Sequence, residues 1–310
     1  MNAVSTPTAA SGRPLAISLL LGVSGWFAGI FMLIFVALLI HPDNAASAAV
    51  TGSVLLAAAW GLFMVAQDGA LVFLAQLALA LSIAGQCLVV YAMGDHAGSL
   101  GPIAAGALVL QVVLALAMPN RLHRTLSTLF ATIAWALTVR FMLFDAHADW
   151  HRDQAPRLPS LPAVLGGWLL TWGPVAAALW WALRNESAWV ARGWAALAQP
   201  LTTGLVAGLA FATLASQPLE STLWFDRGTD AGGLAMWPLL SALAALGALA
   251  AAFAQGRRGL MALCAVAALL HVGYFYYALG TSLLFKSLLM LAMGVACVVA
   301  ARALRSKEAA

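Results

Sequence analysis

The sequence predicts an all-α, polytopic transmembrane helix bundle. Apolar residues make up 63% of the 310 residues, well above the roughly 45–50% of soluble domains. Charged residues are only 8% of the chain and fall almost entirely between long apolar stretches. The alternating pattern of a membrane β-barrel is absent, and in lipid every backbone amide must bond within the protein, which leaves helices as the spanning structure.

Ten apolar stretches are long enough to cross a bilayer. A spanning helix needs roughly 20 residues, because each residue adds about 1.5 Å and the hydrocarbon core is about 30 Å thick. The predicted spans are residues 15–40, 45–66, 70–93, 100–118, 125–144, 161–183, 194–215, 234–254, 260–278 and 283–303. The first is too long for the apolar core of a cleavable signal peptide, and no A-x-A-like site follows it, so we expect it to remain as a span.

The distribution of Lys and Arg predicts that both termini are cytoplasmic. With the N-terminus inside, ten basic residues lie on the cytoplasmic side and three in outer loops, which satisfies the positive-inside rule. The cytoplasmic set is Arg13, Arg121, Arg124, Arg184, Arg192, Arg257, Arg258, Arg302, Arg305 and Lys307, and the outer set is Arg152, Arg157 and Arg227. The net charge of +4 follows from this bias and does not indicate nucleic-acid binding.

The chain is predicted to form one membrane domain. Residues 1–12 are expected to be a disordered tail, residues 13–305 the transmembrane domain, and residues 306–310 a C-terminal tail. The longest outer loop, near residues 145–160, leaves five spans on each side, which permits two inverted halves. Residues 119–124 and 184–193 are expected to be cytoplasmic connections, and no connection is long enough for a soluble catalytic domain.

Small residues at helix-packing spacing occur on two spans. They are Ser18, Gly22, Gly25 and Gly29 on the first span, and Gly204 and Gly208 on the seventh. Such stripes let helix backbones approach closely, and we favour packing within one bundle over a dimer interface. Pro174, in the middle of the sixth span, is expected to kink it.

Ionisable and polar groups of the spans in the outer half of the membrane, with His271 the deepest near the middle of its span, are the candidate binding residues for a substrate or a partner, since charges within a membrane are often functional. This set is Arg140, His271, Tyr274, Tyr276, Tyr277 and Lys286. For Arg140 and Lys286 the favoured alternative is that each side chain reaches outward and pairs with an outer carboxylate. For His271 it is a hydrogen bond within the packed bundle instead of a proton relay.

The outer loop carries a second, weaker pattern. His147 and His151 are four residues apart, so on a helical turn both imidazoles can face one metal ion, with Asp145 or Asp149 as a third ligand. The pattern lacks the glutamate of H-E-x-x-H, and we favour a solvated acidic loop.

One enzyme hypothesis was weighed. Gly22, Ser24 and Gly25 match the G-x-S-G of rhomboid-type intramembrane serine proteases, with His271 as the base. Ser24 is predicted in the inner half of the membrane and His271 in the outer half, whereas a nucleophile and its base need hydrogen-bond contact. No nucleotide, haem or zinc motif is present, so we expect a protein that is not an enzyme and has no cofactor.

The C-terminal region resembles a bacterial membrane family, the domain of unknown function 4401. The resemblance rests on residues 270–277 (LHVGYFYY), Leu279 and residues 281–287 (TSLLFKS), with Leu21-Gly22, Gly25-Trp26 and Gly29 on the first span. It implies a multi-pass protein of the bacterial inner membrane that forms a complex with a second membrane protein from a neighbouring gene. It implies no reaction, adds Thr281 to the candidate residues, and favours Tyr274, Tyr276, Tyr277 and Lys286.

Two functions therefore stay open. The first is a non-enzymatic subunit of a membrane complex, whose last hairpin and acidic outer loops contact the partner. The second is a small-molecule or ion transporter or channel with a site near His271, Tyr274 and Lys286. A transporter is expected to have a polar cavity bordered by broken helices, whereas a subunit can have a dry interior.

Overall fold

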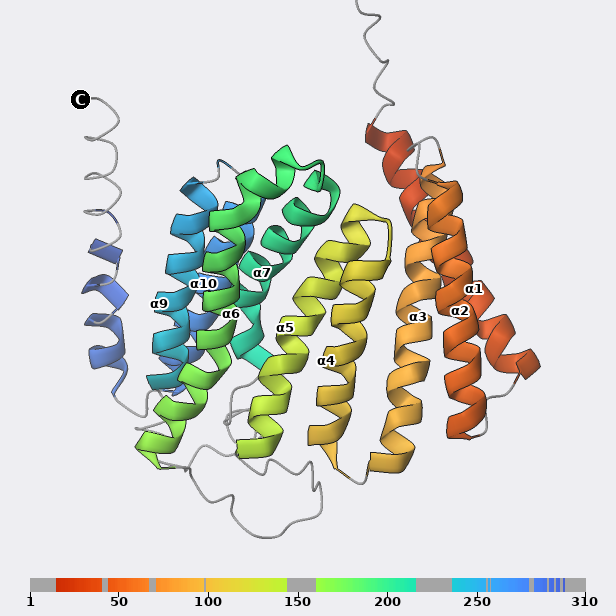
Figure 1. Ribbon diagram of the computed structural model, residues 1–310. Coiled ribbons are helices and arrows are strands. Elements are labelled where there is room, and N and C mark those ends of the chain that lie inside the picture. Colours follow the sequence, from red (N-terminus) through yellow and green to blue (C-terminus); the bar gives the residue numbers. More distant parts are fainter. Residues whose placement is uncertain are drawn as a thin grey trace, which may run out of the picture. The chain divides into compact units, whose positions relative to one another are not determined.

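A computed structural model of the chain describes residues 15–40, 44–66, 71–97, 99–143, 160–215, 236–254, 256, 258–278, 282–288, 290–292, 294–295 and 298. Throughout these residues the regular secondary structure is helical, which confirms the predicted all-α class (Figure 1). Six of the described helices are long and apolar enough to cross a membrane. The chain forms two compact units, residues 1–127 and residues 128–310.

The helices follow the predicted spans closely. They are α1 (Leu15–Ile40), α2 (Ala45–Val65), α3 (Val72–Ala97), α4 (Leu100–Ala117), α5 (Arg121–Leu143), α6 (Leu161–Ala191), α7 (Ala195–Ala215), α9 (Met236–Ala254) and α10 (Arg258–Ala278). The described residues of the predicted last span, 283–288 among them, are also helical.

Two of the predicted connections are shorter than expected. Residues 121–124 belong to α5, because Asn120 caps that helix by accepting a hydrogen bond from the backbone N–H of His123 (3.0 Å). Most of the expected connection 184–193 belongs to α6, which continues to Ala191. Hydropathy marks where a chain leaves the hydrocarbon, whereas a helix continues until a residue breaks it. Here Gly193, with a φ of 85°, follows the end of the helix.

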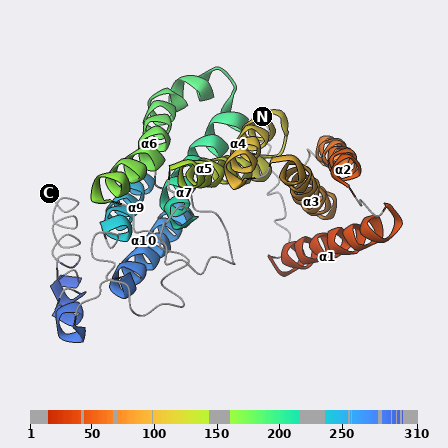
Figure 2. The same ribbon diagram turned by 90° about the horizontal axis from the view of Figure 1, so that it is seen from below.

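In the first unit, α3 packs against α1, α2 and α4 (Figure 2). Glycines set the closest approaches. A Cβ built on Gly25 of α1 meets Gln76 Cβ of α3 at 2.5 Å, and one built on Gly29 meets Ala80 of the same helix. Gly25 and Gly29 thus pack against a helix of their own chain, as the packing interpretation expected.

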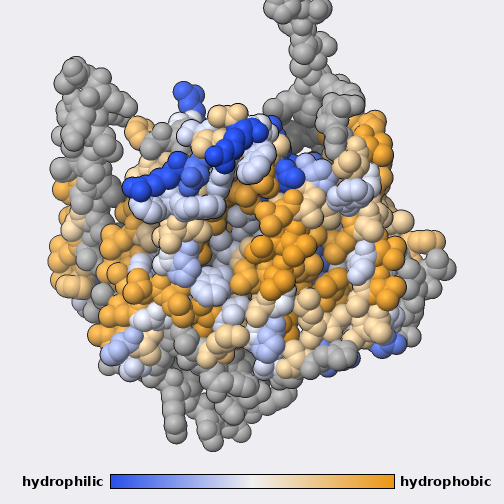
Figure 3. All heavy atoms as spheres, in the orientation of Figure 1, coloured by the Kyte–Doolittle hydropathy of each residue, from blue (hydrophilic) through white to orange (hydrophobic). Residues whose placement is uncertain are grey.

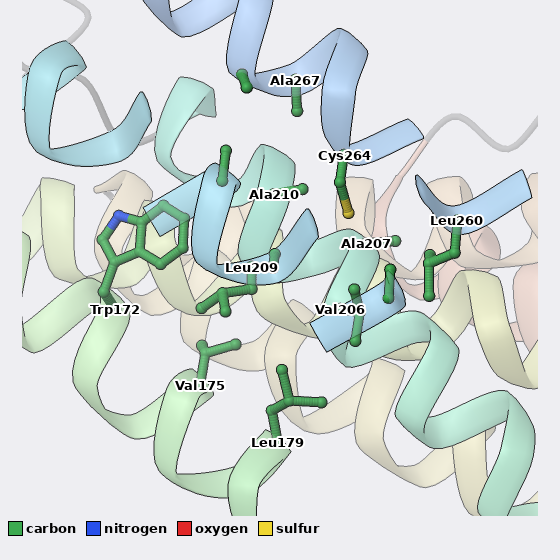
Figure 4. Packing of buried hydrophobic residues seen from close by; sticks show 14 residues of the cluster. Trp172, Val175, Leu179, Val206, Ala207, Leu209, Ala210, Leu260, Cys264 and Ala267 are labelled. Carbon is green, nitrogen blue, oxygen red and sulfur yellow. The ribbon is translucent and has the colours of Figure 1, made fainter. Parts of the chain in front are cut away.

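The second unit is built around α7, which contacts α6, α9 and α10. Its core is made mostly of small residues at helical spacing, shown in part in Figure 4. Ala245, Ala248 and Ala252 of α9 and Cys264 and Ala267 of α10 are 0–1% exposed. Because lipid does not drive helices together as water does, close contact between small side chains supplies the attraction.

Pro174 lies within α6, which continues through it. Proline has no backbone N–H, so the carbonyl of Leu170, four residues earlier, loses its usual donor within the helix. The indole Nε1 of Trp135 on α5 supplies one instead and donates to the Leu170 oxygen at 3.2 Å. A neighbouring helix therefore satisfies the carbonyl that proline frees, as a membrane interior requires.

The exposed surface of both units is largely apolar (Figure 3). Phe31 of α1 and Leu169 of α6 are 69% and 64% exposed. Large exposed apolar side chains on nearly every helix suit contact with lipid chains, which agrees with a multi-pass membrane protein.

Candidate functional site

The most concentrated polar chemistry of the first unit is a chain of hydrogen bonds that joins three helices. We name these five residues the His123 cluster: Ser82 and Gln86 of α3, Gln111 of α4, and His123 and Ser127 of α5. Gln111 Nε2 donates to Gln86 Oε1 (2.7 Å), and Gln86 Nε2 donates to Ser82 Oγ (3.1 Å). Ser82 Oγ lies 2.7 Å from His123 Nε2, and Ser127 Oγ lies 3.3 Å from His123 Nδ1.

The order of donors in the His123 cluster fixes the histidine tautomer. Gln86 Nε2 can only donate, and it lies 3.3 Å from His123 Nε2 as well as 3.1 Å from Ser82 Oγ. This contact makes Nε2 an acceptor, so the Ser82 hydroxyl, 2.7 Å away, donates to it. Nε2 is then the acceptor nitrogen, and Nδ1 carries the ring proton and donates to Ser127. The chain runs in one direction from Gln111 to Ser127. The remaining acceptor, Gln111 Oε1, is buried and has no hydrogen-bond partner among the described residues.

Burial decides what the cluster does in this conformation. Ser82 is 0% exposed, His123 and Ser127 are 1% exposed, and the Phe63 ring makes a T-shaped contact with the imidazole, 5.6 Å between centroids. A serine hydroxyl bonded to an imidazole is the pairing that activates serine nucleophiles. Here both groups are enclosed by side chains, so in this conformation the pair links helices.

Sequence reasoning missed this cluster for two reasons. The candidate residues predicted from the sequence are charged, ionisable or tyrosine side chains, and glutamine is none of these. His123 was assigned to a connection, since the fifth span was predicted to begin at residue 125. A usable signal was present: Gln86 and Gln111 interrupt runs that are otherwise apolar, and a buried amide in lipid needs hydrogen-bond partners.

The candidate residues of the second unit are only partly brought together. His271 is 0% exposed, and its Nε2 lies 3.0 Å from the carbonyl oxygen of Ala210, which joins α10 to α7. Tyr274, one turn later, is half-buried with a buried hydroxyl oxygen. Lys286 Nζ lies 5.2 Å from the ring centroid of Tyr276, within reach of a cation–π contact. The guanidinium of Arg140 lies 5.6 Å from the ring of the adjacent Phe141.

Several candidates cannot be placed. Thr281, the side chain of Tyr277 and the proposed metal ligands Asp145, His147, Asp149 and His151 lie outside the described residues. Within the described part of the chain, no group of three or more His, Cys, Asp or Glu residues is arranged to hold a metal ion.

The hydroxyl of Ser24, weighed above as a nucleophile, donates to the carbonyl of Leu20 in its own helix at 2.8 Å. Serine hydroxyls within membrane helices commonly make this bond, which needs no catalytic explanation.

Comparison with known proteins identifies the family. No curated protein and no solved structure matches the chain. One family model, described as "Domain of unknown function (DUF4401)", matches residues 14–226. The match contains the first-span residues that carried the resemblance, Leu21, Gly22, Gly25, Trp26 and Gly29, together with the His123 cluster. It ends before residues 270–287, so the family match lends no weight to Tyr274, Tyr276 or Lys286. Since the match covers more than half of the sequence, the chain belongs to the DUF4401 family.

Proposed function

We propose that this protein is a non-enzymatic integral subunit of a complex in the bacterial inner membrane. The observation that carries the proposal is the burial and hydrogen bonding of His271, the deepest of the candidate transport residues. It is fully buried and bonded to a backbone carbonyl of α7, so it acts as a contact between helices.

The proposed arrangement has ten spans with both termini in the cytoplasm. The excess of Lys and Arg on one side supports this orientation. The six long apolar helices and the mostly apolar exposed surface support a multi-pass bundle. Loops of this size leave room for partner contacts and none for a separate soluble domain.

The partner is proposed to be a second membrane protein that contacts the hairpin formed by α10 and the segment after it. The contact between Lys286 and Tyr276 supports a defined hairpin. The apolar side chains that follow are widely exposed within this chain, with Leu283 at 77% and Leu284 at 73%. A partner helix that packs there would cover them.

A pull-down from the native membrane tests this proposal. Tagged protein is extracted in mild detergent, and the co-eluting proteins are quantified by mass spectrometry. A membrane protein at fixed stoichiometry is the expected result, and recovery of this chain alone would refute the proposal.

Variants at Lys286 locate the contact. Lys286→Ala is expected to reduce the recovered partner at least twofold, because it removes the cation from the Tyr276 ring, whereas Lys286→Arg keeps a cation over that ring and is expected to retain the partner. Equal recovery from both variants, at equal abundance of the tagged chain, would place the interface elsewhere.

A second candidate function is ion transport, and the His123 cluster favours it. Polar groups within a membrane often mark ion pathways, and Gln111 Oε1 offers an acceptor without a described partner. Purified protein in sealed vesicles, with an internal pH-sensitive dye and a potential imposed by potassium and valinomycin, tests proton movement. Transport predicts proton entry that Ser82→Ala reduces. Entry equal to that of protein-free vesicles would contradict proton transport.

A further inference from the structure

Near the end of α6, Arg184 stacks on the ring of Trp180. We propose that Arg184, held against Trp180, binds the phosphate of an anionic phospholipid headgroup. The two residues, with the exposed Arg192 at the end of the helix, form a surface that we call the α6 headgroup site.

The length of α6 places this site at the membrane surface. The helix has 31 residues and is therefore about 46 Å long, against a hydrocarbon core of about 30 Å. Trp180 follows the helix start at Leu161 by about 30 Å of helix. With Leu161 at the outer membrane surface, where the predicted sixth span begins, the indole of Trp180 lies at the depth where tryptophan is enriched, between acyl chains and headgroups. Trp180 and Trp181 are 57% and 58% exposed, so both are open to the surrounding lipid.

The geometry of Arg184 directs its charge to this depth. Its guanidinium carbon lies 3.7 Å from the centroid of the Trp180 ring. Trp180 precedes Arg184 by one helical turn, on the side toward the middle of the helix. This stacking uses the flat face of the guanidinium and leaves its N–H groups at the edge. Within the described part of the chain, no carboxylate or carbonyl accepts a hydrogen bond from Arg184. An arginine that is held in place with open N–H groups suits bidentate binding of a phosphate.

The surroundings keep the site positive. Glu186 is the nearest acid in sequence, but residues two apart on a helix do not face each other. Arg192 lies two turns beyond Arg184 along the helix and is exposed. On the same stretch of α6, Trp181 and Trp189 pack edge to face, 5.0 Å between ring centroids. Hydrophilic side chains gather at the end of this unit where α6 meets α7, next to an apolar surface (Figure 3).

The occupant is a lipid because the phosphate site and an apolar surface are adjacent. A free phosphate uses the charge alone, whereas a phospholipid also places its acyl chains along the exposed apolar residues of α6, such as Leu169 and Leu170. An anionic headgroup is favoured over a zwitterionic one, because the site contains two arginines and Glu186, the nearest acid in sequence, does not share the face of Arg184.

Native mass spectrometry of the full chain tests the proposal. The detergent-solubilised protein is titrated with dioleoyl phosphatidylglycerol or, as the zwitterionic comparison, dioleoyl phosphatidylcholine, and bound lipid is counted. One arginine near an anionic headgroup contributes about 1 kcal/mol, so Arg184→Gln is expected to weaken phosphatidylglycerol binding about fivefold. Trp180→Leu keeps the charge but removes the ring that positions it, and is expected to weaken binding at least twofold.

Arg258→Gln is the matched control, because Arg258 is also an exposed arginine at a helix end, but no aromatic ring of the described residues makes a cation–π contact with it. It is expected to change the affinity less than twofold. Equal weakening by Arg184→Gln and Arg258→Gln would overturn the proposal, because it would show general charge attraction. Equal binding of the two lipids would also overturn it, as would displacement of phosphatidylglycerol by an equal concentration of glycerol phosphate. Thermal unfolding in lipid-free detergent verifies that each variant is folded.

Discussion

Replacing Gly52 with alanine measures how much the close contact between α2 and α3 contributes to stability. A Cβ on Gly52 would lie 2.7 Å from the carbonyl oxygen of Gly85, 2.9 Å from Val89 Cγ2 and 3.1 Å from Leu88 Cβ. The oxygen belongs to a helix backbone, which cannot rotate away as a side chain does. The two helices must therefore separate by several tenths of an ångström, and overpacking of this kind costs about 1–3 kcal/mol.

Gly61 of the same helix supplies the control. A Cβ at Gly61 meets nothing within 4 Å, so Gly61→Ala changes only the backbone preference, which favours alanine in a helix by about 1 kcal/mol. The same gain applies to Gly52→Ala. The difference in unfolding free energy between the two variants therefore isolates the steric cost, which we expect to be about 1–3 kcal/mol against Gly52→Ala.

Unfolding in mixed micelles with increasing dodecyl sulfate, followed by circular dichroism, provides the measurement. The reciprocal contact predicts that Gly85→Ala behaves like Gly52→Ala, since its Cβ meets the Gly52 oxygen at 2.7 Å. One separation of the helices relieves both clashes, so the double variant should lose less than the sum of the single losses. If Gly52→Ala is as stable as Gly61→Ala, the contact does not hold these helices together and the reasoning fails.

Two further predictions concern buried hydrogen bonds. Trp135→Phe removes the donor to the Leu170 carbonyl and is expected to lower the free energy of unfolding by about 1 kcal/mol. In a Pro174→Ala background this loss should vanish, because alanine restores the backbone N–H that bonds the same carbonyl. A loss that persists in that background would show that the effect comes from packing of the indole. Gln86→Leu breaks the His123 cluster at its centre and is expected to cost about 1–3 kcal/mol, more than Gln111→Leu at its end. The same unfolding titration orders the two variants, and a larger loss from Gln111→Leu would contradict the central position of Gln86 in the His123 cluster.

The class of fold and the positions of most helices follow from the sequence alone, because a single physical requirement sets them. A segment that crosses lipid must be apolar and about 20 residues long, and it must satisfy its own backbone, so composition and length suffice. The first predicted span, residues 15–40, coincides with α1. The end of α6 was predicted less well, because helix continuation outside the membrane depends on local capping at Gly193 and not on hydropathy.

The candidate sites depend on which helix faces which, and only the tertiary structure decided that. No local pattern pairs Ser82 with His123, 41 residues later, or His271 with the carbonyl of Ala210. The apolar residues of a membrane helix surround it on all sides, so hydropathy gives little indication of which face packs inward. Sequence thus determined where the chain meets the membrane, and helix packing determined which polar groups meet one another.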